Sequence, residues 1–175
     1  MTYKKERGMG MELKIPENFF VGAAMSGPQT EGAYKTGGRL ESIWDTWSDL
    51  SISDFYNKVG SYVGNNFYEK YEDDIKLLKS LHMDSFRTSM QWSRLLTKDG
   101  KLNQEGAQFY HKVCKCAKEN QIELFMNLYH FDMPTYLFER GGWESRDVVG
   151  SLCTYARAAF REFGSEIPGT GLLSN

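Results

Sequence analysis

The sequence lacks the features that mark nucleic-acid-binding and membrane proteins. It has 21 Lys plus Arg against 23 Asp plus Glu, so the net charge is −2 and no basic surplus is present to contact phosphates. A mean hydropathy of −0.53 and the absence of a long apolar run argue against a membrane span. Residues 1–12 are polar and charged, without the apolar stretch of a secretory signal. We therefore expect a cytoplasmic protein that binds neither nucleic acid nor membrane.

Cysteine is also scarce. The three residues Cys114, Cys116 and Cys153 are too few, and odd in number, for a disulfide framework. A metal site built from His111, Cys114 and Cys116 is disfavoured, because residues two apart on a helix point to nearly opposite sides. We expect reduced thiols and no metal.

What the sequence does contain is a repeated alternation of strand and helix patterns. Apolar runs predict strands over 19–25, 85–92 and 122–128, and amphipathic patterns predict helices over 66–81, 103–119 and 145–164. A hydrophobic content of 41% is sufficient for a packed core, and 175 residues make one domain or part of a larger one. Apolar strands alternating with amphipathic helices predict a parallel sheet covered by helices.

The helices are predicted from apolar stripes at spacings of three and four. The first is Tyr68, Tyr71, Ile75, Leu78 and Leu81, the second is Tyr110, Val113, Cys114 and Ala117, and the third is Val149, Leu152, Cys153, Ala156, Phe160 and Phe163. Asn103 is placed to cap the second helix, and Gly164 to end the third.

Two architectures fit this alternation, a doubly wound sheet and a (β/α)8 barrel. No G-x-G-x-x-G follows the first strand and no Walker A sequence occurs, which lowers the nucleotide-binding alternative. A barrel needs about 250 residues for eight units, and three units cannot close one.

In either architecture the site lies at the carboxyl ends of the strands. An amide, an imidazole and aromatic rings gather there, a set that suits a sugar because hydroxyls need hydrogen bonds and sugar faces stack on rings. The residues are Gln29 and Glu31 after the first strand, Arg87, Gln91 and Trp92 near the end of the second, and His130, Phe131 and Asp132 after the third.

Structural roles compete with these functional ones. Gln29 can cap a turn, His130 can be a structural donor, and Trp44 and Trp92 are by default packing residues. We expect Glu31 to anchor a loop through backbone amides. Arg87 differs, because a charge inside a barrel strand requires a carboxylate partner.

Six segments in register resemble glycoside hydrolase family 1. They are FFVGAAMSGPQTEGA at 19–33, SIWDTW at 42–47, NFYEKYEDDI at 66–75, FRTSMQWSRL at 86–95, YHFDMP at 129–134 and RGGW at 140–143. Val21, Pro28 and Glu69 depart from the residues usual at those positions. The match covers about 16–164.

The resemblance implies the first three βα units of a (β/α)8 barrel and hydrolysis with retention by two glutamates, without a cofactor or metal. Gln29 and His130 match positions that hydrogen-bond sugar hydroxyls, and Phe131 would form an aromatic wall. Arg87 matches the Arg that keeps the nucleophile ionised. Segments 26–32 and 87–92 resemble members that act on 6-phospho-β-glucosides, whose phosphate loop lies near the eighth strand. A β-glucosidase or 6-phospho-β-galactosidase specificity is the alternative.

Neither implied catalytic glutamate is expected here. One should follow a fourth strand in an Asn-Glu-Pro sequence, which these 175 residues do not contain. We divide the chain into an extension at 1–15, a partial barrel at 16–164 and an atypical tail at 165–175, in which Pro168, Gly169 and Gly171 argue against a strand. The tail fits a frameshift, a truncation or an added sequence.

Three hypotheses remain. The first is a catalytically inactive part of a 6-phospho-β-glucosidase, which would bind a phosphorylated β-glucoside. The second is a non-catalytic sugar-binding or self-associating module, because an open sheet exposes its edges. The third is a small α/β enzyme of unrelated chemistry.

Overall fold

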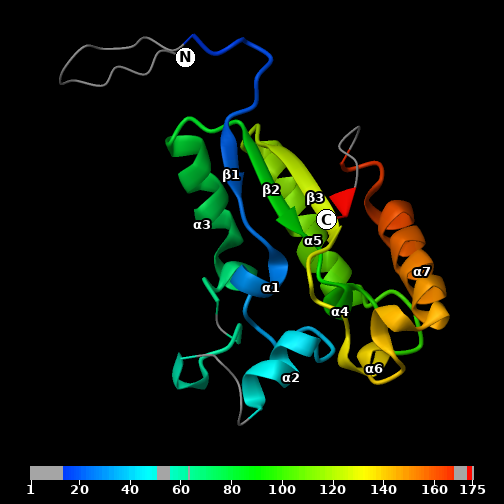
Figure 1. Ribbon diagram of the computed structural model, residues 1–175. Coiled ribbons are helices and arrows are strands. Elements are labelled where there is room, and N and C mark those ends of the chain that lie inside the picture. The colour runs from blue at the N-terminus through cyan, green and yellow to red at the C-terminus, as the bar shows by residue number, and fades with distance from the viewer. Residues whose placement is uncertain (1–13, 51–55, 63, 168–172, 175) are drawn as a thin grey trace.

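A parallel sheet forms the centre of the computed structural model, which describes residues 14–50, 56–62, 64–167 and 173–174 (Figure 1). Its strands are β1 (Gly22–Ala24), β2 (Ser85–Ser89), β3 (Glu123–Tyr129) and the short β4 (Leu173–Ser174). Their order in the sheet is their order in the chain, and each pair is parallel. A doubly wound sheet reverses its order at a switch point, whereas a barrel adds each strand beside the last. The topology is therefore that of consecutive barrel units.

Three long helices connect successive strands. They are α3 (Phe67–Ser80), α5 (Gln104–Glu119) and α7 (Arg146–Phe163). Figure 1 shows the short helices gathered at the lower end of the sheet, where the strand arrows end. These are α1 (Gly27–Thr30), α2 (Ile43–Asp49), α4 (Trp92–Leu95) and α6 (Thr135–Phe138), with the 3-10 turns η1 (Tyr56–Lys58) and η2 (Gly142–Glu144).

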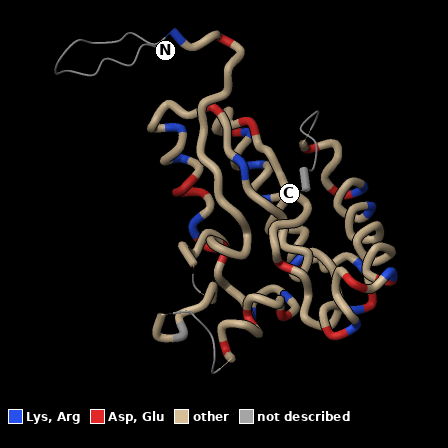
Figure 2. The backbone as a smooth tube through the Cα atoms, viewed as in Figure 1, with Lys and Arg blue, Asp and Glu red and all other residues tan. Residues whose placement is uncertain are grey.

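The core lies between the sheet and the long helices. Phe86 and Leu124 are adjacent in register and buried, and they belong to one cluster with Ile75, Val113 and Phe163. The stripe predicted for α5 is buried at all four positions. Figure 2 shows both acidic and basic residues along the helices. Within the described residues no helix is long and apolar enough to cross a membrane.

Two predictions about buried faces are wrong. The first strand was expected to be buried over 19–25, but β1 has three residues and Phe19 and Phe20 are 59% and 54% exposed. The cause is that β1 forms the edge of the sheet. In α7 the predicted stripe leaves Val149 and Phe160 exposed, while Tyr155 is fully buried. The buried face is selected by Tyr155, whose hydroxyl donates to the carbonyls of Met90 and Leu128.

Two smaller predictions also need correction. Asn103 stands at the N-cap position of α5, but its side chain makes no capping bond and donates instead to the carbonyls of Gly37 and Arg94. The tail was expected to contribute no strand, yet Leu173 pairs with Asn127 in β4. Pro168, Gly169 and Gly171 lie outside the described residues.

Candidate functional site

A pocket of about 360 Å³ lies at the carboxyl ends of the strands, and it contains three of the four predicted site residues. Gln29, His130 and Phe131 line it with Pro28, Trp44, Val59, Gly60, Ser61 and Gly64. The volume lies within the range of small-molecule sites, roughly 300–1,000 Å³. Residues about 100 positions apart in the sequence, after β1 and after β3, therefore meet in one cavity.

Gln29 is positioned by α1, which is attached to the end of β2. The amide of Gly27 donates to Ser89 Oγ at 2.8 Å, and a Cβ at Gly27 would lie 2.9 Å from the Ser89 carbonyl oxygen, so α1 packs against β2 only with glycine here. The Gln29 side chain is exposed and accepts a hydrogen bond from Ser26 Oγ at 2.5 Å. Gln29 is thus a hydrogen-bond partner in its own turn and also lines the pocket.

His130 enters the pocket partly buried and with capacity to bind a ligand. Burial lowers the pKa of His130, and the positive charge of Arg87 lowers it further, so the imidazole is neutral at pH 7. Its Nδ1 atom is buried and has no hydrogen-bond partner among the described residues. A neutral imidazole has one donor and one acceptor nitrogen, which suits a hydroxyl group.

Phe131 lines the pocket with a half-exposed ring, and further aromatic rings lie nearby. The ring is 53% exposed and its centroid lies 5.0 Å from that of His130. Trp143, 52% exposed, lies edge-on to Tyr129 and donates its indole N–H to the Tyr129 hydroxyl at 3.3 Å. Such half-exposed rings can stack on the apolar face of a sugar.

Arg87 does not line this pocket. Its Nε donates to Asn127 Oδ1 at 3.2 Å, between neighbouring positions of β2 and β3. The carboxylate partner expected for Arg87 is not found within the described ranges, and the guanidinium is only half-buried. Asn127 Nδ2 is buried without a partner in the same part of the structure. Within the described residues, Arg87 and Asn127 thus have donor atoms without a full set of hydrogen-bond partners.

A buried polar network beneath the pocket was only partly anticipated. Glu31 accepts hydrogen bonds from Arg94 Nε at 2.7 Å, Gln91 Nε2 at 2.7 Å and the Tyr110 hydroxyl at 2.8 Å. Burial lowers the pKa of Arg94, but the charge of Glu31 outweighs burial and the pKa is raised. Glu31 is therefore a loop anchor, as expected, but it binds side chains rather than backbone amides.

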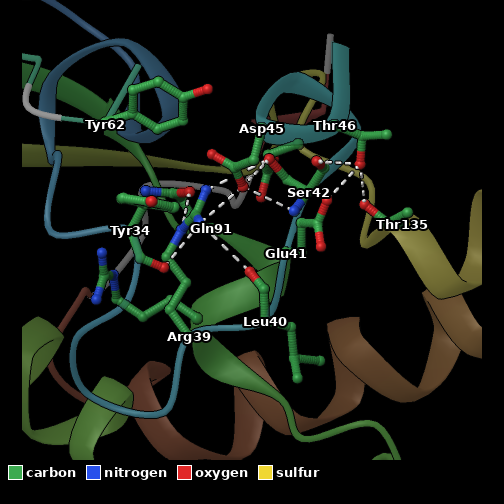
Figure 3. Close-up of polar contacts among 12 residues, drawn as sticks. Tyr34, Arg39, Leu40, Glu41, Ser42, Asp45, Thr46, Tyr62, Gln91 and Thr135 are labelled. Atoms are coloured by element: carbon green, nitrogen blue, oxygen red, sulfur yellow. Dashed lines mark hydrogen bonds and ion pairs between the residues drawn. The ribbon is translucent and has the colours of Figure 1, made fainter. Parts of the chain in front are cut away.

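The network continues through Gln91 to a second ion pair (Figure 3). Gln91 Oε1 accepts from Arg39 Nε at 3.0 Å, and Arg39 pairs with Asp45 at 2.8 Å. Asp45 also accepts from the backbone amide of Ser42, which starts α2. Glu31, which directly follows α1, is thus connected through Gln91 and Arg39 to α2, which carries Trp44.

The sequence analysis missed Ser61 as a pocket residue. Its hydroxyl oxygen is buried and has no hydrogen-bond partner among the described residues. No pattern in the sequence marks it, because it lies in a loop among other serines and glycines. Only the folded chain shows that Ser61 lines the same pocket as His130 and Gln29.

Two of the three cysteines are part of the buried core. Within the described ranges no group of three or more His, Cys, Asp or Glu side chains is arranged to hold a metal ion. Cys114 and Cys116 are free and buried, and burial raises the pKa of Cys114 to about 12.

Comparison with known proteins gives consistent matches. The model of "Glycosyl hydrolase family 1" matches residues 11–170. The chain is 40% identical over 157 residues to the 6-phospho-beta-glucosidase GmuD of Bacillus subtilis, covering 89% of this chain and 34% of that protein. It is 39% identical to beta-glucosidase 9 of Arabidopsis thaliana, covering 87% and 30%.

Solved structures agree. The beta-glucosidase from Exiguobacterium antarcticum B7 superposes with a TM-score of 0.85 at 36% identity, over 89% of this chain and 35% of that one. The rice Os3BGlu6 beta-glucosidase gives 0.82 at 34% identity, over 87% and 32%. The chain thus spans about a third of the length of these relatives.

Proposed function

Because this chain belongs to glycosyl hydrolase family 1, we propose that it forms the sugar-binding rim of a retaining β-glycosidase that acts on 6-phospho-β-glucosides. The observation that carries the proposal is the meeting of Gln29, His130 and Phe131 in one pocket. The fold itself is that of the family's (β/α)8 barrel, of which the chain forms consecutive units from the first onward.

The pocket residues have separate roles in this proposal. The Gln29 amide and the neutral His130 imidazole exchange hydrogen bonds with sugar hydroxyls, and the Phe131 ring covers the apolar face of the sugar. Arg87, on the inner face of the sheet, would stand beside the nucleophile and favour its ionised form.

The chain by itself should not hydrolyse a glycoside. Retention requires two carboxyl groups about 5 Å apart, one as acid and base and one as nucleophile. The resemblance places neither among these 175 residues, and the buried Glu31 is engaged by Arg94, Gln91 and Tyr110. Binding and hydrolysis are therefore separable in this protein.

The phosphate preference rests on two sequence segments and on one of the relatives. GmuD is a 6-phospho-beta-glucosidase, while the Arabidopsis and rice relatives are beta-glucosidases. An unphosphorylated β-glucoside and a 6-phospho-β-galactoside are the competing substrates. A cytoplasmic location belongs to the same proposal, because a sugar phosphorylated during uptake is met inside the cell.

The experiment is calorimetry of the 175-residue chain with methyl β-D-glucoside and with its 6-phosphate, beside a chromogenic assay with both sugars. We expect weak binding heat, no hydrolysis above buffer, and loss of heat in the Gln29→Ala and His130→Ala variants. His82→Ala is the matched control, since His82 is exposed on the turn after α3. Absence of heat with either sugar contradicts the binding role, and equal heat for both contradicts a phosphate preference within this chain.

A second candidate function, self-association, is favoured by the exposed edge of the sheet. Phe19 and Phe20 are more than half exposed beside β1, and the Phe20 ring lies 5.7 Å from Phe125 on the inner face. Exposed apolar groups at a strand edge favour pairing with another chain. Sedimentation velocity over a range of concentrations tests this, and a monomer at every concentration argues against it.

A further inference from the structure

We propose that Asp132 is a positioning residue of the pocket, whose buried carboxylate ties the end of β2 to the turn after β3 and so holds His130 and Phe131 toward the ligand. The proposal rests on the proposed sugar-binding function. Asp132 itself does not line the pocket, and it would act only through its neighbours.

The carboxylate joins two backbone segments that are distant in the sequence. Asp132 is fully buried, and its Oδ2 accepts from the backbone amide of Trp92 at 2.6 Å while its Oδ1 accepts from the amide of His130 at 3.2 Å. Trp92 is the first residue of α4, which begins three positions after the last residue of β2. One side chain therefore fixes the exit of β2 relative to the exit of β3.

The hydrogen bond from the His130 amide to Asp132 spans one residue, Phe131, whose backbone is strained. Phe131 lies between Asp132 and His130 and has φ of 65°, in the left-handed region that residues with a Cβ avoid. Such a conformation persists only where the surroundings hold it. The bond from the His130 amide spans Phe131, and the bond from the Trp92 amide anchors Asp132, so together they hold the turn that contains Phe131.

The surroundings of Asp132 leave its charge only partly balanced. Burial raises the pKa of Asp132 to about 7, against the hydrogen bonds from the amides of His130 and Trp92 and the more distant charge of Arg39, which lower it. The other titratable groups that face it are Tyr129 and Tyr155, both uncharged at pH 7. Protonation near neutral pH would weaken the two amide bonds, since a carboxylate is the stronger acceptor.

The first test uses the unaltered chain and NMR. The carboxyl carbon of Asp132 and the backbone amides of Trp92 and His130 should titrate with one common midpoint. Different midpoints for the two amides would overturn the proposal, because they would show that no single carboxylate holds both.

The second test is the pKa of His130 in Asp132→Asn, which distinguishes position from charge. Removal of a nearby negative charge alone lowers the pKa of a histidine. If Asp132 positions the turn, its loss frees His130 from burial and from Arg87, the two causes that lower its pKa, and the pKa rises. A rise supports the proposal, and a fall or no change overturns it.

A further variant provides a control. Phe131 itself is left unchanged, because its ring lies 5.0 Å from that of His130 and its removal would also reduce the burial that lowers the pKa of His130. Asp84→Asn is the matched control, because Asp84 also accepts from a backbone amide, Val21, at 2.7 Å but lies at the opposite end of the strands and is exposed. A rise in the pKa of His130 in Asp84→Asn counts against the proposal.

The last arm measures the affinity for methyl β-D-glucoside at pH 8, where Asp132 is ionised. Asp132→Asn should bind on the order of tenfold more weakly, as for the loss of about one hydrogen bond. If the unaltered chain binds no glucoside, the proposed function fails, while the NMR tests still decide whether Asp132 positions His130. Unchanged affinity in a variant with a raised pKa of His130 overturns the link between position and binding.

Discussion

His130 at the pocket and His111 in the outer layer occupy opposite kinds of environment. His111 lies between two carboxylates, with Nδ1 2.6 Å from Glu166 and Nε2 2.9 Å from Glu162, and its ring packs against Phe163. His130 has a buried nitrogen without a partner in the described structure and faces the positive charge of Arg87. His111 thus has both ring nitrogens paired within the chain, whereas His130 has a ring nitrogen without a partner among the described residues.

The largest expected effect is at Glu31, in the buried network beneath the pocket, where the carboxylate accepts three hydrogen bonds. Glu31→Gln should lower the free energy of unfolding by about 3–5 kcal/mol, because it leaves the fully buried Arg94 guanidinium without its counter-charge. Denaturant unfolding measures the loss. The exposed pair of Lys76 and Glu72 is the control, and Glu72→Gln should change stability by less than about 0.5 kcal/mol. Equal losses of stability in the two variants would show that the buried Glu31 network contributes no more than an exposed ion pair.

The second test compares glycine in the pocket and in the outer layer. At position 131, Gly should be more stable than Ala by about 1 kcal/mol, since φ is 65° and only Gly adopts it freely. In α7 the order should reverse, because a Cβ at Gly150 meets nothing within 4 Å and Ala favours the helix by ~1 kcal/mol. Thermal unfolding of Phe131→Gly, Phe131→Ala and Gly150→Ala measures both differences. The same order at both positions would show that Phe131 is not strained.

The sequence predicts features that depend on local patterns and misses those that depend on distant contacts. The βα alternation and the α5 stripe were readable, because helix and strand periods are local properties of the chain. The burial of Val148 rather than Val149 was not, since both flank one stripe and the distant carbonyls of Met90 and Leu128 select the face through Tyr155.

The candidate site was likewise predicted only in part from the sequence. Gln29, His130 and Phe131 could be named from their place after strands, and the structure brings them into one pocket. Several bonds that support them join residues far apart in the sequence, 40 positions between Trp92 and Asp132 and 63 between Arg94 and Glu31, and no local pattern shows such partners.

The smallest expected effect is the pH dependence of stability at His111. Burial lowers the pKa of His111, but the hydrogen bonds and charges of Glu162 and Glu166 outweigh burial and raise it. A histidine whose pKa is higher in the folded state stabilises the fold fully below its unfolded pKa, about 6.5, and loses that contribution as pH rises through the folded pKa. The three side chains are about a third exposed, so we expect less than about 1 kcal/mol.

The measurement is the stability difference between the unaltered chain and His111→Gln, taken by denaturant unfolding at pH 5.5 and pH 8.5, about one unit below and two units above the ordinary pKa. It should be larger at pH 5.5. For His130→Gln the sign should be opposite, because the pKa of His130 is lowered in the folded state and protonation below about 6.5 opposes folding. Glu162→Gln should reduce the His111 effect and leave the His130 effect unchanged, since Glu162 bonds only the first of these rings. Two differences of the same sign would show that the environments of His111 and His130 do not shift the pKa values of the two histidines in opposite directions.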